Sequence, residues 1–261
     1  MSNEHPFLAI SIGNTSTTLA TFIDGSISDQ SALLSSNTSE IVALALDWWK
    51  KLDGENPQIV LASSNEEFSN TISKMLQDQT SRQIWQIGSD IPVAIGQHLD
   101  PETITGIDRL LNAAAAWELL KEACIVIDVG TCVTVDFVDG EGTFHGGGIA
   151  PGAQMQLNAM HSGTSSLPEV IFERPLREAF GKNTAQAMLQ GVYNGIQGMV
   201  RQLSEQYASR YGAYPRVIAT GGNAEVLFSE DEFIEQIISD LQLQGIAISV
   251  KHAMTAQEHD S

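Results

Sequence analysis

Cysteine and positive charge are what this sequence has least of. Its two cysteines, Cys124 and Cys132, are too few for a disulfide framework, and no Cys/His cluster has the spacing of zinc ligands. Both lie in or beside apolar segments, so we expect small buried side chains. Lysine and arginine total 13 against 32 acidic residues, a formal net charge of −19. Such a chain repels phosphodiester backbones and anionic lipid, which argues against partners such as nucleic acid or membranes.

Long hydrophobic runs are also missing. No apolar stretch approaches the roughly 18 residues that a membrane helix needs, and the first thirty residues lack the basic flank of a secretory signal. We therefore expect a soluble cytoplasmic protein. If its ligands are anions, they need a locally basic pocket, for which Arg109, Arg174, Arg177 and Lys182 are candidates.

One pattern of strands and turns occurs twice. Each copy has an apolar strand, a glycine- and threonine-containing turn, a second strand and an Asp-Gly hairpin; the copies span 7–25 and 125–140. Asp-Gly turns are common, so chance similarity of two hairpins is an alternative. The strands and helices that follow in both halves favour duplication.

The remaining periodicity alternates between helices and strands. Helices are predicted at 39–52, 65–77, 108–123, 184–210 and around 223–243, and strands at 59–62, 84–87, 143–149 and 216–219. This predicts an α/β protein with two domains, 1–115 and 116–261, and a ligand cleft between them. Gly191, Gly195 and Gly198 lie near the apolar stripe of one helix, which indicates close packing on its own sheet or on another subunit.

Both repeated turns have the residues of a phosphate cradle. Glycine lets a backbone approach a phosphate closely, and hydroxyl groups donate to its oxygens. The two candidate cradles are Gly13, Asn14, Thr15, Thr17 and Thr18, and Gly130, Thr131 and Thr134. Either turn alone is weak evidence, whereas the pair favours a polyphosphate gripped from both sides.

Two aspartates have both a chemical and a structural interpretation. Asp108 opens a predicted helix, where aspartate is most often an N-cap. With Arg109 beside it, the carboxylate is also suited to accept a hydroxyl proton while the guanidinium holds an anion, and the two roles are compatible. Asp128 ends an apolar strand, where a carboxylate suits either a cation or simple turn chemistry.

In this order and spacing, the segments from about residue 8 to 228 resemble the type III pantothenate kinases, within the superfamily of acetate and sugar kinases, actin and chaperone ATPases. The motifs that carry the resemblance are Gly13-Asn14-Thr15, Gly106-Ile107-Asp108-Arg109, Asp128-Val129-Gly130-Thr131 with Thr134 and Asp136, Gly147-Gly148-Ile149 with Pro151-Gly152, Gly181 to Thr184, and Ala219-Thr220-Gly221-Gly222. The resemblance implies two duplicated ribonuclease H-like (actin-like ATPase) domains, a homodimer, and a kinase. The implied reaction is ATP-dependent phosphorylation of pantothenate to 4'-phosphopantothenate, the first step of coenzyme A biosynthesis.

The resemblance also implies roles for individual residues. Asp108 is implied as the catalytic general base. The implied pantothenate-binding residues are His98, Gly106, Ile107, Asp108, Arg109 and Thr184, the last from the partner subunit or nearby. The implied ATP-binding residues are Ser11, Gly13, Asn14, Thr15, Thr18 and Thr131. Asp128 is implied as the ligand of a monovalent cation, potassium or ammonium, while Mg²⁺ accompanies ATP.

Two positions depart from the family pattern. Ser11 stands where the family has an aspartate, and the internal repeat aligns it with Asp128, so we expect impaired magnesium use. His98 stands where a tyrosine lining the pantothenate pocket is usual. Ser11 favours an alternative, a catalytically weak nucleotide-binding relative with a regulatory role, whereas the retained Asp108 and Asp128 oppose it. A sugar or acetate kinase on the same scaffold is a third reading.

Overall fold

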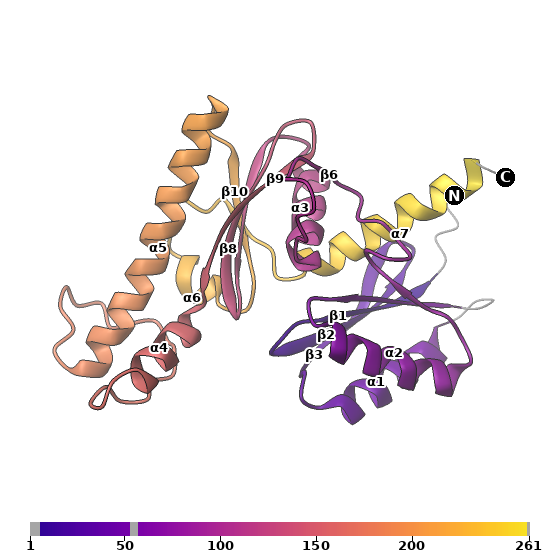
Figure 1. Cartoon of the computed structure of the whole chain (residues 1–261), viewed down its shortest axis with the longest axis horizontal. Coiled ribbons are helices and arrows are strands. Elements are labelled where there is room, and N and C mark those ends of the chain that lie inside the picture. The colour runs from indigo at the N-terminus through magenta and orange to yellow at the C-terminus, as the bar shows by residue number, and fades with distance from the viewer. Residues whose placement is uncertain (1–5, 53–56, 260–261) are drawn as a thin grey trace. The chain divides into compact units, whose positions relative to one another are not determined.

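The computed structural model describes residues 6–52 and 57–259, which form two compact units (Figure 1). The second unit consists of residues 96–101 and 119–240, and the rest of the described chain forms the first. These units differ from the predicted contiguous halves chiefly because helix α7 (Leu241–His259) belongs to the first unit. None of the described helices is both long and apolar enough to cross a membrane.

The first unit is built on a five-stranded sheet with the order β3-β2-β1-β4-β5. Its strands are β1 (Phe7–Ile12), β2 (Ser16–Ile23), β3 (Ser26–Leu34), β4 (Gln58–Ser63) and β5 (Ile84–Gln86). Its helices are α1 (Thr38–Lys51), α2 (Glu66–Thr80), α7 and most of α3 (Ile107–Leu120). Strand β1 pairs with β2 antiparallel and with β4 parallel. The predicted helices and strands of this half therefore form, with boundaries shifted by a few residues.

The central strand β1 is buried along its whole length because helices cover both faces of the sheet. Its alternate residues Leu8, Ile10 and Ile12 join a core with α1 and α2, which Figure 1 shows together on one side of the sheet. Phe7 and Ala9, whose side chains lie on the opposite face of the sheet, join a second core with α3 and α7. This packing gives the C-terminal helix its place in the first unit.

The second unit has a six-stranded sheet with the order β11-β10-β7-β8-β9-β6. Its strands are β6 (Gly96–Gln97), β7 (Cys124–Val129), β8 (Cys132–Val138), β9 (Thr143–Pro151), β10 (Arg216–Thr220) and β11 (Gln236–Ile237). Strand β7 pairs antiparallel with β8 and parallel with β10, as β1 pairs with β2 and β4. The order β9-β8-β7-β10-β11 thus repeats β3-β2-β1-β4-β5 strand for strand, and the predicted duplication is confirmed.

The pairing register identifies equivalent residues in the two sheets. Ser11 lies opposite Thr18, and Asp128 lies opposite Thr134, each pair one step before the turn that joins its two strands. Ser11 in the first sheet therefore occupies the position equivalent to that of Asp128 in the second, with a hydroxyl in place of the carboxylate.

Three helices complete the second unit: α4 (Ala153–Ser162), α5 (Thr184–Tyr211) and α6 (Ala224–Phe228). The long helix predicted at 184–210 is confirmed, whereas most of the helical stretch predicted around 223–243 is loop and the short strand β11. Side chains of α5 such as Ile196 and Val200 are buried in the core with the sheet. A Cβ added at Gly191, Gly195 or Gly198 meets no atom within 4 Å, so packing on the unit's own sheet does not explain these glycines.

Candidate functional site

The first candidate cradle is a tight turn stabilised by hydrogen bonds within the turn and from Ser35. The Gly13 N–H donates to the carbonyl of Ser16 (2.9 Å), and the Ser35 hydroxyl donates to the carbonyl of Gly13 (2.8 Å). The hydroxyls of Ser35 and Thr17 are hydrogen-bonded at 3.0 Å, and Thr17 is fully buried. Thr17 therefore stabilises the turn, and the prediction that its hydroxyl donates to a phosphate is wrong. Sequence offers no local signal for Ser35, which reaches the turn from the far end of β3.

The other predicted residues of this turn are more accessible. Asn14 and Thr15 are exposed and Thr18 is half-buried, whereas Ser11 retains only 5% of its accessible surface. Asn14 and Thr15 thus present polar groups to solvent at the carboxyl end of β1, and Ser11 lies beneath them.

The second candidate cradle relies on glycine at a close approach of two chain segments. The Gly130 N–H donates to the carbonyl of Cys132, and the Gly152 N–H donates to that of Thr131, both at 2.9 Å. A Cβ at Gly152 would lie 2.3 Å from the Gly130 carbonyl oxygen, so no other residue fits there without moving the backbone. The Thr131 side chain is exposed at the tip of the turn.

The two cysteines have different environments. Cys124 is buried, and burial together with the nearby charge of Glu122 raises the pKa of its thiol to about 12. Cys132 is exposed because it is the first residue of β8, immediately after the turn, so its predicted burial is wrong.

Asp128 lies at the carboxyl end of β7 among hydroxyl-bearing neighbours. Thr220 on β10 and Thr134 on β8 are its register partners. Gly221 has φ +94°, and a Cβ there would lie 2.4 Å from the Asp128 Oδ1 atom. Glycine thus lets the next turn close over the carboxylate. Carboxylate and hydroxyl oxygens are the ligands that hard cations prefer, so these residue types are compatible with the cation predicted at Asp128.

Among the described residues, no group of three or more His, Cys, Asp and Glu side chains is arranged to hold a metal ion.

Asp108 lies in the first turn of α3 rather than ahead of it. Its Oδ1 accepts a hydrogen bond from the Arg109 N–H (2.9 Å), and residues 6–52 and 57–259 provide no other partner for this carboxylate. A Cβ at Gly106 would lie 2.5 Å from the same Oδ1, so glycine makes room for the carboxylate. Ile107 packs on Gly88 and the core of the first unit. Asp108 is therefore not the N-cap residue that was predicted, although its carboxylate satisfies a free N–H of the first turn. This bond is compatible with the chemical interpretation, because the carboxylate keeps free lone pairs.

The last two candidates lie in the second unit. Thr184 is exposed as the first residue of α5, where Asn183 caps the helix by accepting from the Gln186 N–H (2.9 Å). His98 follows β6 directly and its side chain is exposed. Its backbone N–H donates to the carbonyl of Phe144 (2.9 Å). The second unit thus contains His98, Asp128, Thr131 and Thr184, and the first contains the other residues that the resemblance implies for binding pantothenate and ATP.

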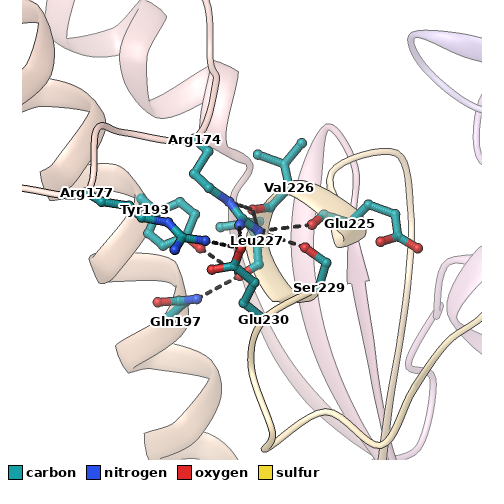
Figure 2. A network of polar contacts seen from close by, with 9 residues as sticks. All are labelled: Arg174, Arg177, Tyr193, Gln197, Glu225, Val226, Leu227, Ser229 and Glu230. Carbon is teal, nitrogen blue, oxygen red and sulfur yellow. Dashed lines mark hydrogen bonds and ion pairs between the residues drawn. The ribbon is translucent and has the colours of Figure 1, made fainter.

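Arg174, Arg177 and Lys182, which were proposed for a basic pocket, all form ion pairs, and Figure 2 shows those of the two arginines. Arg174 donates from Nε and Nη2 to the carbonyl of Val226 (3.1 and 2.9 Å), and its Nη1 lies 2.8 Å from Glu230. Arg177 also pairs with Glu230, and Lys182 pairs with Glu178 at 2.6 Å.

Arg174 is therefore a cap on the C-terminal end of α6, where carbonyl groups lack helical partners and favour a cation. Tyr193 and Gln197 of α5 add to this cap by donating to the carbonyl of Leu227 at 3.1 and 2.7 Å (Figure 2). Glu230 neutralises the charge of the arginine. The predicted basic pocket thus does not form around these residues.

Comparison with solved structures places the fold. The chain aligns with a conserved Baf family transcriptional activator from Campylobacter jejuni with a TM-score of 0.64 and 18% identity, over 95% of this chain and 100% of that one. It aligns with MreB 5 of Spiroplasma citri, bound to AMPPNP, with a TM-score of 0.52 and 9% identity, over 99% and 100% of the two chains. With the repeated strand order, these likenesses confirm the predicted ribonuclease H-like, actin-like fold in both units.

Comparison of sequences identifies the family. The type III pantothenate kinase of Rhodospirillum rubrum is 42% identical over 159 residues, which cover 61% of this chain and 62% of that one. That of Dehalococcoides mccartyi strain CBDB1 is 31% identical over 251 residues, 92% and 93% of the two chains. The family model for type III pantothenate kinase matches residues 7–206. The chain therefore belongs to the type III pantothenate kinase family.

Proposed function

We propose that this protein is a kinase that transfers the terminal phosphoryl group of ATP to the primary hydroxyl of pantothenate, in the cytoplasm, as the first step of coenzyme A biosynthesis. The observation that carries the proposal is the family match over residues 7–206, a segment that includes both turns and the pair Asp108 and Arg109. The duplicated turns supply polar groups at equivalent strand ends, as a bound polyphosphate requires. Neither the fold nor the relatives favour the regulatory alternative.

The proposed roles are those that the family resemblance implies. They suit phosphoryl transfer, which depends mainly on positioning and charge neutralisation. Asp108 takes the hydroxyl proton, and Arg109 holds the substrate carboxylate. Gly13, Asn14, Thr15 and Thr18 bind phosphate oxygens in the first unit, as Thr131 does in the second. Asp128 is the ligand of potassium or ammonium. Magnesium bound with ATP supplies charge neutralisation of the phosphates.

ATP turnover should depend on pantothenate. We expect ADP release to rise severalfold above the basal rate when pantothenate is added to the purified chain with ATP, magnesium and potassium. Glucose and acetate serve as control acceptors, because sugar and acetate kinases share the scaffold. ATP binding without turnover on any acceptor would contradict the proposal and favour the regulatory role.

A homodimer completes the proposal, and the segment 163–183 is the surface that supports it. This segment has no regular secondary structure, but side-chain amides hydrogen-bond to its backbone. Gln154 donates to the carbonyl of Val170 and accepts from the Phe172 N–H, and Gln186 accepts from the Leu176 N–H. Its large apolar side chains nevertheless face solvent, with exposed fractions of 81% for Ile171, 62% for Leu176 and 79% for Phe180. Ordered, exposed apolar surface is typical of protein interfaces.

We expect Phe180→Asp to shift the chain from dimer to monomer in sedimentation velocity, because a second copy would have to bury that carboxylate. Ile23→Asp introduces the same charge at an exposed position of the first unit and should leave the dimer intact. If the unmodified chain sediments as a monomer at micromolar concentration, the homodimer proposal is wrong.

A further inference from the structure

The edge of the second sheet brings together two histidines that are far apart in the sequence. Strand β6 runs parallel to β9, with Gln97 opposite Phe144, and the hydrogen bond from the His98 N–H to the Phe144 carbonyl extends this pairing by one residue. The imidazole of His98 therefore meets that of His145. Their ring centroids are 5.3 Å apart and their planes lie at 88°, an edge-to-face contact.

His145 is itself fixed by Asp139. The His145 Nε2 and Asp139 Oδ2 atoms are 2.7 Å apart, and the Asp139 Oδ1 accepts from the N–H groups of Glu141 (3.0 Å) and Thr143 (2.9 Å). Partial burial alone would raise the pKa of the Asp139 carboxyl, but the hydrogen bonds from His145 and the backbone lower it below its ordinary value. The ring of Phe137 packs against His145 at 5.6 Å between centroids. The imidazole of His145 is thus held in one orientation.

His98 differs from His145 because its ring nitrogens have no hydrogen-bond partner among the described residues. Its side chain is exposed, so a ligand can reach it. The ring of His98 thus lies against His145, while both of its nitrogens lack a partner among the described residues. A group that is oriented but unsatisfied is suited to contact a polar ligand.

We propose that His145, anchored by Asp139, is a positioning residue that fixes the imidazole of His98 for contact with the substrate. The inference rests on the proposed function and on the contact with pantothenate that the family resemblance implies for His98, and it adds the residues that orient that contact. An unfixed His98 ring would have to be ordered each time the substrate binds, which lowers affinity rather than the rate of the chemical step.

We expect His145→Ala to raise KM for pantothenate by about two- to tenfold, the size of effect that aromatic ring pairs have in double-mutant cycles. KM for ATP and kcat should change less than twofold. In the His98→Ala background the same substitution should have no further effect, because its target is gone. Asp139→Asn should reproduce part of the rise. His161→Ala is the matched control, because His161 is bonded to the Leu167 carbonyl and has no ring partner among the described residues.

A second measurement separates this inference from the proposed function. In proton NMR spectra of the full chain, the ring resonances of His98 should move when His145 is replaced and stay in place when His161 is replaced. Unchanged resonances, or a pantothenate KM that His145→Ala leaves unaltered in an active enzyme, would overturn the inference and leave the proposed function standing. If the unmodified chain does not phosphorylate pantothenate, the proposed function fails, and the resonances alone decide whether His145 orients His98.

Discussion

Replacing Asp108 with asparagine is expected to lower kcat for pantothenate phosphorylation by about 10²–10⁴-fold, the usual contribution of a general base. Asparagine matches aspartate in size and keeps an oxygen that can accept the hydrogen bond from the Arg109 N–H, so the first turn of α3 should be unchanged. The amide cannot take a proton from the substrate hydroxyl. Steady-state ADP release at saturating pantothenate measures the loss.

The same substitution should leave KM for ATP within about threefold, because the proposed role of Asp108 lies with the alcohol and not the nucleotide. Asp78→Asn makes the identical chemical change at an exposed position of α2 and should retain full activity. A kcat for Asp108→Asn within tenfold of the unmodified enzyme would exclude Asp108 as the base. Binding of pantothenate by the variant would show that the site itself is intact.

Introducing a carboxylate at Ser11 is expected to raise turnover at limiting magnesium by about ten- to a hundredfold. One charge-assisted contact to the magnesium–phosphate complex is worth about 1.5–3 kcal/mol. The pairing register supports the choice of this position, because Ser11 holds the place in the first sheet that Asp128 holds in the second. A carboxylate is therefore compatible with this strand position, and Ser11→Asp should place one near the first turn.

The control for this prediction is Ser11→Asn, which has nearly the size of aspartate but no charge. It should leave the magnesium dependence unchanged or weaken it, because Ser11 is only 5% exposed and a larger neutral side chain gains nothing there. Magnesium titrations of ADP release at fixed ATP distinguish the variants. If Ser11→Asp leaves both magnesium affinity and turnover unaltered, the prediction is wrong and another group already contacts the magnesium–phosphate complex.

Local sequence patterns were sufficient for much of the fold. The apolar run of β1 and the three- and four-residue spacing of Met188, Val192 and Ile196 on α5 predict a strand and a helix, because side-chain burial imposes these periods. The repeat was also visible, since each copy carries its own turn residues, and the sheet orders confirm it. Asp108, whose environment comes from Gly106 and Arg109 within the same turn, was identified as a candidate for the same reason.

Contacts between distant residues could not be read in this way. Thr17 looks like its neighbours in the sequence. Only its hydrogen bond to Ser35, the residue that follows β3, shows that its hydroxyl stabilises the turn and is not a ligand for phosphate. Arg174 likewise becomes a helix cap only because α6 ends beside it.

Sequence patterns alone thus predict two similar α/β halves, their strands and turns, and the resemblance to the family. Only the folded chain shows that the C-terminal helix completes the first unit, that Arg174 is bound to backbone carbonyls, and that the ring of His145 lies against that of His98. The physical reason is the range of the interactions involved. Helices, strands and turns depend on neighbours a few residues away, whereas the environment of a side chain depends on whichever segments the folded chain brings beside it.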